Sequence, residues 1–194
     1  GIDSVDKRYP GKRHSNIAMV NWKFADLYNT GIVKCPTMIY SNRPIPVEIA
    51  FEDAIKAMIF NRSMAQVESL NLSIVNYMED RGYMKWVLSK MGERKDSLKK
   101  GDAPSGKSAY IDEIVLLINS VTNIPLTKED IYLLENFWHY ELLEDISVFN
   151  KADTHKNDLS MSLGQALLGA VKLLSKKLRK PSELNSGVLD YLLN

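Results

Sequence analysis

The sequence contains one cysteine, Cys35, which excludes an internal disulfide and any metal site built mainly from cysteine thiolates. It has no apolar run near the roughly 18 residues that a membrane-spanning helix needs. Its first residues lack the basic and apolar regions of a secretion signal. Neither sign of charge dominates, because 25 Lys and Arg stand against 24 Asp and Glu. We therefore expect a cytosolic protein with no membrane partner, and we seek nucleic-acid contacts only in local basic clusters.

The length and composition indicate an ordinary globular protein. The chain has 194 residues, of which 45% are hydrophobic and 25% are charged. These values exclude intrinsic disorder and collagen-like repeats, and the length favours one domain. We expect a single domain over residues 1 to 194, whose segment from about residue 181 to residue 194 is a tail.

Hydrophobic periodicity predicts alternating strands and helices in the first half of the chain. Short apolar runs bounded by turn residues indicate strands, and apolar positions at helical spacing indicate helices. The predicted strands cover residues 16 to 24, 31 to 40, 64 to 68 and 84 to 88, and the predicted helices cover residues 47 to 61 and 72 to 81. We expect the first strands to form an antiparallel meander and the second helix to end at Gly82. This alternation is typical of an α/β sheet.

The second half of the chain is predicted to be mainly helical. Residues 89 to 107 form a basic loop with few apolar side chains. Helices are expected over residues 108 to 120, 127 to 145 and 159 to 178, and Pro181 ends the last one.

The most regular motif runs from Gly101 to Ser108 and matches the phosphate-binding loop pattern G-x-x-x-x-G-K-[ST]. That motif needs an apolar strand leading into the loop, so that backbone N–H groups converge on the phosphates. Residues 93 to 100 are instead strongly charged. We expect a basic loop that matches the pattern by coincidence, and a phosphate-loop NTPase fragment remains an alternative.

Three acidic residues fall where an α/β sheet presents functional groups. Asp3 lies in an N-terminal strand, Glu68 at the end of a central strand, and Asp158 at the start of the last helix. Two-metal phosphoryl transfer needs such carboxylates, because Mg²⁺ and Mn²⁺ prefer oxygen ligands from several elements. Each acid also has a simpler interpretation: a terminal residue, a surface charge at a strand end, and the N-cap of a helix, respectively.

The ordered set of acidic motifs resembles the nuclease domain of terminase large subunits, the DNA-packaging motors of tailed phages and herpesviruses. Residues 67 to 75, with the helix that ends near Gly82, resemble the second acidic motif of that family. Residues 157 to 163 resemble the third motif, in which an acid opens an apolar helix, and Ile2 to Asp6 resemble the first. The third motif of the family often reads His-Asp-Asp, whereas this chain has Lys156, Asn157 and Asp158 at those positions.

The resemblance implies a ribonuclease H-like fold, with a mixed central sheet flanked by helices. It also implies a metal-dependent endonuclease that cuts concatemeric viral DNA during genome packaging, in the cytoplasm of a phage-infected host cell. Two Mg²⁺ or Mn²⁺ ions would be held by Asp3, Glu68 and Asp158, with Asp6 as an auxiliary ligand. The implied partners are double-stranded DNA, the ATPase domain of the same motor protein, the portal and the small terminase subunit. The chain would then be a fragment of a longer packaging motor.

Two basic clusters are expected to contact the DNA backbone. Their members are Lys7, Arg8, Lys12 and Arg13 after the first acid, and Lys99, Lys100 and Lys107 in the basic loop. The same clusters would also suit a DNA-binding module without catalysis, which is a further alternative.

Overall fold

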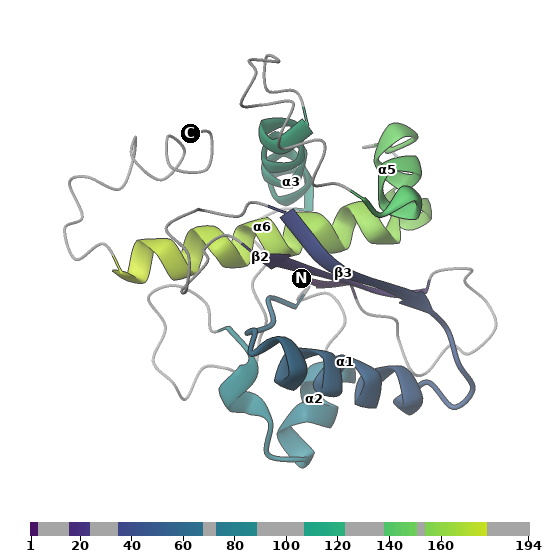
Figure 1. The fold of residues 1–194 in the computed structure, drawn as a ribbon, viewed down its shortest axis with the longest axis vertical. Helices are drawn as coiled ribbons and strands as arrows, with labels where there is room; N and C mark the ends of the chain where they lie inside the picture. Colours follow the sequence, from purple (N-terminus) through teal and green to yellow (C-terminus); the bar gives the residue numbers. More distant parts are fainter. Residues whose placement is uncertain are drawn as a thin grey trace.

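The computed structural model describes residues 1–3, 16–23, 35–67, 73–88, 107–122, 138–150 and 154–177. These segments form a mixed α/β fold around a small sheet (Figure 1). Three strands, β1 (Ile2–Asp3), β2 (Ile17–Lys23) and β3 (Cys35–Asn42), pair antiparallel in the order β1-β2-β3. The predicted antiparallel meander is therefore confirmed.

Two isolated parallel bridges adjoin the sheet beyond β1. Ile2 bridges Val67, and Ala65 bridges Val87, both in the parallel sense. Backbone hydrogen bonds support the bridges: the Ile2 N–H donates to the Gln66 carbonyl at 2.9 Å, and the Leu88 N–H donates to the Ala65 carbonyl at 2.8 Å. The strand predicted over residues 64 to 68 is thus reduced to isolated bridges within its described part.

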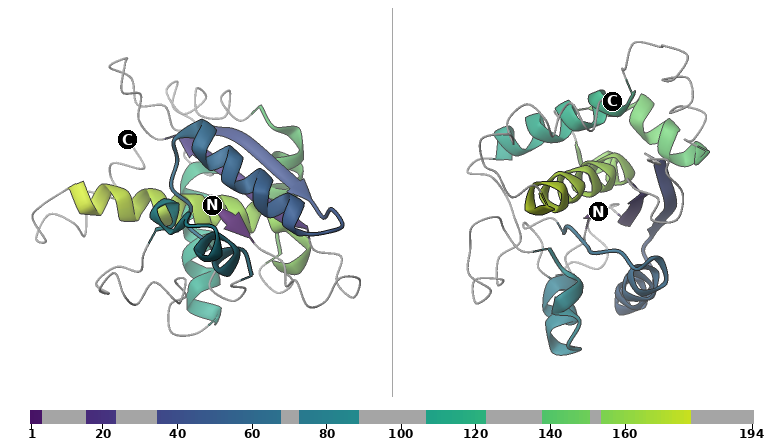
Figure 2. Two further views of the ribbon diagram at one scale, coloured as in Figure 1. Left: turned by 90° about the horizontal axis from the view of Figure 1, so that it is seen from below. Right: turned by 60° about the vertical axis from the view of Figure 1, so that its left-hand side comes forward.

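Among the described helices, two cover one face of the sheet and three cover the other. α1 (Glu48–Asn61) and α2 (Ser73–Asp80), both predicted as helices, pack on one side, and the chain turns after α2 at Gly82, whose φ is +76°. α3 (Lys107–Thr122), α5 (Tyr140–Ser147) and α6 (Asp158–Lys177) pack on the other side. Figure 2 shows α6 lying between α3 and the sheet. The helices expected over residues 108 to 120 and 159 to 178 are confirmed, with small shifts at their ends.

Two predictions of secondary structure are wrong. The strand expected over residues 84 to 88 begins instead as a 3₁₀ helix, η1 (Met84–Trp86), and only Val87 makes a strand-like bridge. The helix expected over residues 127 to 145 is wrong at Trp138 and His139, which are not helical: His139 is extended, with φ −87° and ψ 99°. α5 begins at Tyr140, and residues 127–137 lie outside the described residues.

The alternation of side chains along β2 divides the core in two. Ile17 and Met19 join the apolar cluster on the α1 side, whereas Ala18, Val20 and Trp22 join the cluster on the α6 side. α6 is buried at every residue from 159 to 170, which fits a helix covered on both sides. Among the described helices, none combines the length and apolarity needed to cross a membrane.

Candidate metal centre

Asp158 is the first residue of α6 and is tied to the sheet by its side chain. Its Oδ2 oxygen accepts the backbone N–H of Asn16 at 2.8 Å. Asn16 immediately precedes β2, so this bond joins the start of the helix to the start of the strand. Asn157 precedes Asp158 in the chain, and its carbonyl accepts the first hydrogen bond of the helix, which the Met161 N–H donates. The Asp158 carboxylate therefore bonds across the fold, which goes beyond the helix-capping role considered above.

Asp3 lies in β1 directly opposite Ala18 of β2. Its neighbour Ile2 belongs to the core on the α1 side, so alternation along the strand directs the Asp3 side chain to the α6 side. Ala18 belongs to the core on that same side. Asp3 is partly buried.

The segment from Asn16 to Ala18 connects these two acids. Asn16 donates to Asp158, and Ala18 pairs with Asp3 two residues further along β2. Ser162, one helical turn after Asp158, reinforces the link: its Oγ donates to the Gly1 carbonyl at 2.9 Å and to the Ala18 carbonyl at 3.2 Å. The first turns of α6 are thereby held against both β1 and β2, on the face to which Asp3 points.

Another acid near the start of α6, Asp145, was not among the site residues predicted from the sequence. Asp145, in the last turn of α5, accepts the Ser160 N–H through Oδ1 at 3.0 Å. The Ser160 hydroxyl donates to the same oxygen. Asp145 therefore caps the first turn of α6 from another helix, a contact that no local sequence pattern encodes.

The other predicted site residues lie outside the described part of the chain. They are Glu68, Asp6, Lys7, Arg8, Lys12, Arg13, Lys99 and Lys100. Lys107 is the first residue of α3, but the structure does not describe its side chain. Residues 101–106 of the phosphate-loop pattern also lie outside the described residues. Within the described residues, no three His, Cys, Asp or Glu side chains form a group able to hold a metal ion. The structure thus relates Asp3 and Asp158 to one segment and does not describe the third predicted ligand.

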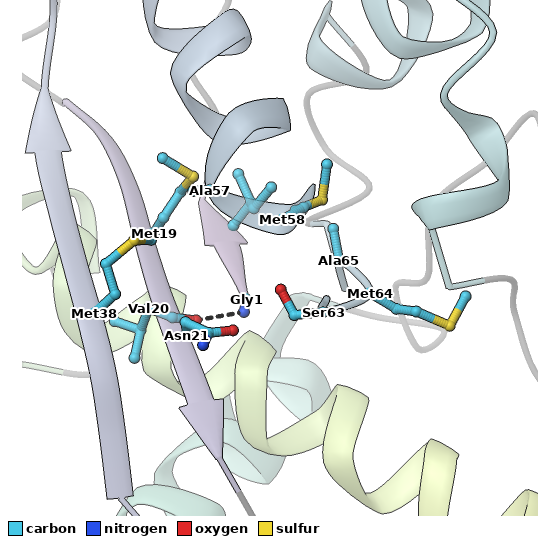
Figure 3. A pocket seen from close by; sticks show the side chains of 11 residues that line it. Gly1, Met19, Val20, Asn21, Met38, Ala57, Met58, Ser63, Met64 and Ala65 are labelled. Carbon is cyan, nitrogen blue, oxygen red and sulfur yellow. Dashed lines mark hydrogen bonds between the residues drawn. The ribbon is translucent and has the colours of Figure 1, made fainter. Parts of the chain in front are cut away.

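A small pocket lies on the α1 side of the sheet, away from the face to which Asp3 points (Figure 3). Its lining includes four methionines, Met19, Met38, Met58 and Met64. Its cavity volume of about 20 Å³ holds roughly one water molecule. Beside it, the Gly1 nitrogen donates to the Val20 carbonyl at 2.7 Å. The pocket is too small for a nucleotide or a sugar.

Comparisons with known proteins were made at three levels. No protein-family model, no curated protein and no solved structure matches this chain. The functional argument therefore depends on the residues and geometry described above.

Proposed function

We propose that this chain is a metal-dependent DNA endonuclease with a ribonuclease H-like fold, of the kind found in terminase large subunits. One observation carries the proposal: Asp3 and Asp158, which lie far apart in the sequence, are both joined to the short segment from Asn16 to Ala18. Carboxylates from separate elements that meet at one end of a sheet are the arrangement that two-metal phosphoryl transfer requires.

The pairing of the sheet supports the proposed fold. The antiparallel sheet, β1 to β3, is adjoined by isolated parallel bridges at Val67 and Val87, so both senses of pairing occur among the described residues. Helices flank the sheet on both sides. A mixed central sheet flanked by helices is what the resemblance to the nuclease family implies.

Glu68 is assigned the third carboxylate of the site. It follows Val67 directly in the sequence, and Val67 bridges Ile2, the residue before Asp3. The parallel pairing therefore brings the residue before Glu68 beside the residue before Asp3. Glu68 itself is outside the described residues, so its ligand role depends on this register and on the sequence motif.

The donor set fits a hard divalent cation. Asp3 and Asp158 offer carboxylate oxygens, the ligands that Mg²⁺ and Mn²⁺ prefer, and both residues are only partly buried. In this proposal they hold two such ions together with Glu68, with Asp6 as an auxiliary ligand. Bound there, the ions would activate water and stabilise the leaving oxygen of the phosphodiester. The bond from Asn16 orients the Asp158 carboxylate toward the sheet.

The proposed substrate is double-stranded DNA held through its backbone. Lys7, Arg8, Lys12 and Arg13 follow Asp3 in the sequence, and in this proposal their positive charges contact the DNA phosphates. In a terminase, such a domain would cut concatemeric DNA in the host cytoplasm beside an ATPase domain, a portal and a small subunit. Little sequence preference is expected, because backbone contacts carry no base information.

The proposal is tested by cleavage of supercoiled plasmid DNA with the 194-residue chain. Mg²⁺ or Mn²⁺ should activate cutting and raise the melting temperature, because the folded state holds the site and the unfolded chain does not. EDTA should stop cutting, and Ca²⁺ should not support it. Asp158→Asn keeps the shape and an acceptor for Asn16 but removes a charged ligand, so it should abolish cutting.

The matched control is Asp80→Asn, which removes an exposed carboxylate at the end of α2 on the other side of the sheet. It should cut like the parent. If Asp158→Asn also cuts like the parent, the nuclease assignment is wrong. DNA binding without cutting in either metal would favour the non-catalytic DNA-binding module instead.

A further inference from the structure

The end of α5 and the start of α6 are joined by a cluster of polar contacts centred on Asp145. Its Oδ1 oxygen accepts the Ser160 N–H at 3.0 Å and also the Ser160 hydroxyl. Asp145 is partly buried and Ser160 is fully buried. The second bond therefore lies where water does not readily compete for the serine hydroxyl.

Asn157 adds a second link between the same two helices. Its Nδ2 group donates to the Asp145 carbonyl at 3.1 Å, and its Oδ1 oxygen accepts the Asn150 N–H at 3.3 Å. Asn157 is only 2% exposed. The residue immediately before Asp158 is thus fixed through its side-chain amide to the last turn of α5 and to Asn150, which follows that helix.

The residues that make these contacts flank Asp158 in the sequence. Asn157 precedes it and Ser160 follows two residues later, so both neighbours in the first turn are held by α5. The Asp158 carboxylate is held separately by the backbone N–H of Asn16. The first N–H groups of a helix need acceptors from outside the helix, and here α5 provides one for Ser160.

We infer that Asp145 is a positioning residue for the metal site, which it serves by fixing the first turn of α6 and hence the Asp158 carboxylate. This inference rests on the proposed nuclease function. Partners that orient a metal-ligating residue typically change metal affinity or activity by 10- to 100-fold when they are removed. Asp145 is expected to act in this way without contacting the metal.

The test compares Mn²⁺ titrations of two properties, the melting temperature and plasmid cleavage, for the parent chain and its variants. We define the Mn²⁺ midpoint as the concentration that gives half-maximal cleavage or, for melting, a fixed rise in melting temperature, because that temperature does not saturate with metal. Asp145→Ala should raise this value about 10-fold in both titrations. Asp145→Asn keeps an oxygen that accepts from Ser160, so it should restore a midpoint close to that of the parent. Ser160→Ala removes only the hydroxyl donor, and its midpoint should fall between these two values. These milder variants keep the test decisive if Asp145→Ala does not fold.

The control is Leu142→Ala, which removes a fully buried side chain of the same helix and leaves the polar links intact. It should lower the melting temperature without metal but leave the Mn²⁺ midpoint unchanged. If Leu142→Ala moves the midpoint as far as Asp145→Ala, Asp145 has only a structural role and the inference is overturned. If the parent responds to Mn²⁺ but the midpoint is unchanged in Asp145→Ala and Ser160→Ala, the inference about Asp145 is overturned and the proposed function is not. A parent without any response to Mn²⁺ overturns the proposed function and this inference together.

Discussion

The Oδ2 oxygen of Asp158 accepts the backbone N–H of Asn16 at 2.8 Å, although 142 residues separate them in the sequence. The bond connects the start of α6, which is buried from residue 159 to residue 170, to the start of β2. Because α5 holds the same turn of α6 through Asp145, the position of Asp158 is defined from two sides. A carboxylate fixed in this way is suited to a site that depends on spacing between ligands.

The close approach of α3 to α6 depends on Gly164. A Cβ added there would meet the fully buried Ile114 side chain, with Cγ1 at 2.9 Å, Cβ at 3.1 Å and Cγ2 closer still. Gly164→Ala should therefore lower the free energy of unfolding by about 1–3 kcal/mol, as overpacking of a core does. Urea denaturation of the parent and the variant measures this difference.

A second substitution distinguishes this contact from a general effect of alanine. Ile114→Ala removes both γ carbons and should relieve the clash, so the double variant should lose less stability than the two single losses added together. A coupling of about 1 kcal/mol or more is expected for residues in contact. Simple additivity would show that Gly164 is not what sets the distance between the helices.

Much of the secondary structure follows from local sequence patterns. α1, α2 and α6 have apolar residues at helical spacing, and Gly82 ends α2 with a positive φ that glycine adopts readily. The apolar run from Met84 to Val87 was ambiguous, because short apolar runs suit both strands and helical turns. The start of α5 after His139 was also missed: the His139 carbonyl accepts the first hydrogen bonds of α5, and no side-chain cap marks this start.

The candidate site was only partly predictable. Asp3 and Asp158 stand out as acids at the ends of predicted elements, and the ordered motifs predicted that both bind metal. Asp145 was hidden, because its contact with Ser160 depends on how α5 packs against α6. The bond from Asn16 to Asp158 depends likewise on the tertiary packing of α6 against β2. Periodicity within one segment carries no information about such pairs.

Tyr77 links α2 to α1, and its phenol should lose its proton only at an unusually high pH. Its hydroxyl donates to the Glu52 Oε1 oxygen at 2.6 Å, and Arg81 pairs with that same oxygen at 3.0 Å. The hydrogen bond to Glu52 raises the pKa of Tyr77, and desolvation adds to the rise. The folded state therefore keeps this proton at a pH where the unfolded chain loses it. The resulting stabilisation is complete below the unfolded pKa near 10 and is lost as the pH rises through the folded pKa.

Absorbance titration of tyrosinate checks this prediction through the difference between the parent and Tyr77→Phe. The difference curve should have its midpoint above pH 10, and Glu52→Gln should move the midpoint toward the ordinary value. The chain has nine tyrosines, so only the difference identifies Tyr77. A midpoint at or below 10 in the parent would show that the bond to Glu52 does not control this phenol.

The phosphate-loop pattern from Gly101 to Ser108 should not bind nucleotide. The motif needs an apolar strand before the loop, and residues 93 to 100 carry mainly charged side chains. Calorimetric titration of the chain with ATP should show no binding at concentrations on the order of 100 μM, a range in which nucleotide sites ordinarily bind. Binding that Lys107→Ala removes would instead support the NTPase alternative.

DNA affinity should depend steeply on salt and little on sequence. A protein that contacts only phosphates gains affinity by releasing counterions, so log K falls linearly with log salt, by about 0.9 per neutralised phosphate. Replacing Lys12 and Arg13 with alanine removes two of the expected contacts and should therefore reduce the slope by about 2.

The matched control replaces Lys56 and Lys85, which are exposed on α1 and η1, on the face of the sheet away from Asp158. It makes the same change in net charge and should leave the slope nearly unchanged. Fluorescence anisotropy with a labelled duplex, in Ca²⁺ to prevent cutting, measures both slopes, and two duplexes of unrelated sequence should give similar values. An unchanged slope in the Lys12 and Arg13 variant would move the DNA contact elsewhere, with Lys99 and Lys100 of the basic loop as the next residues to replace.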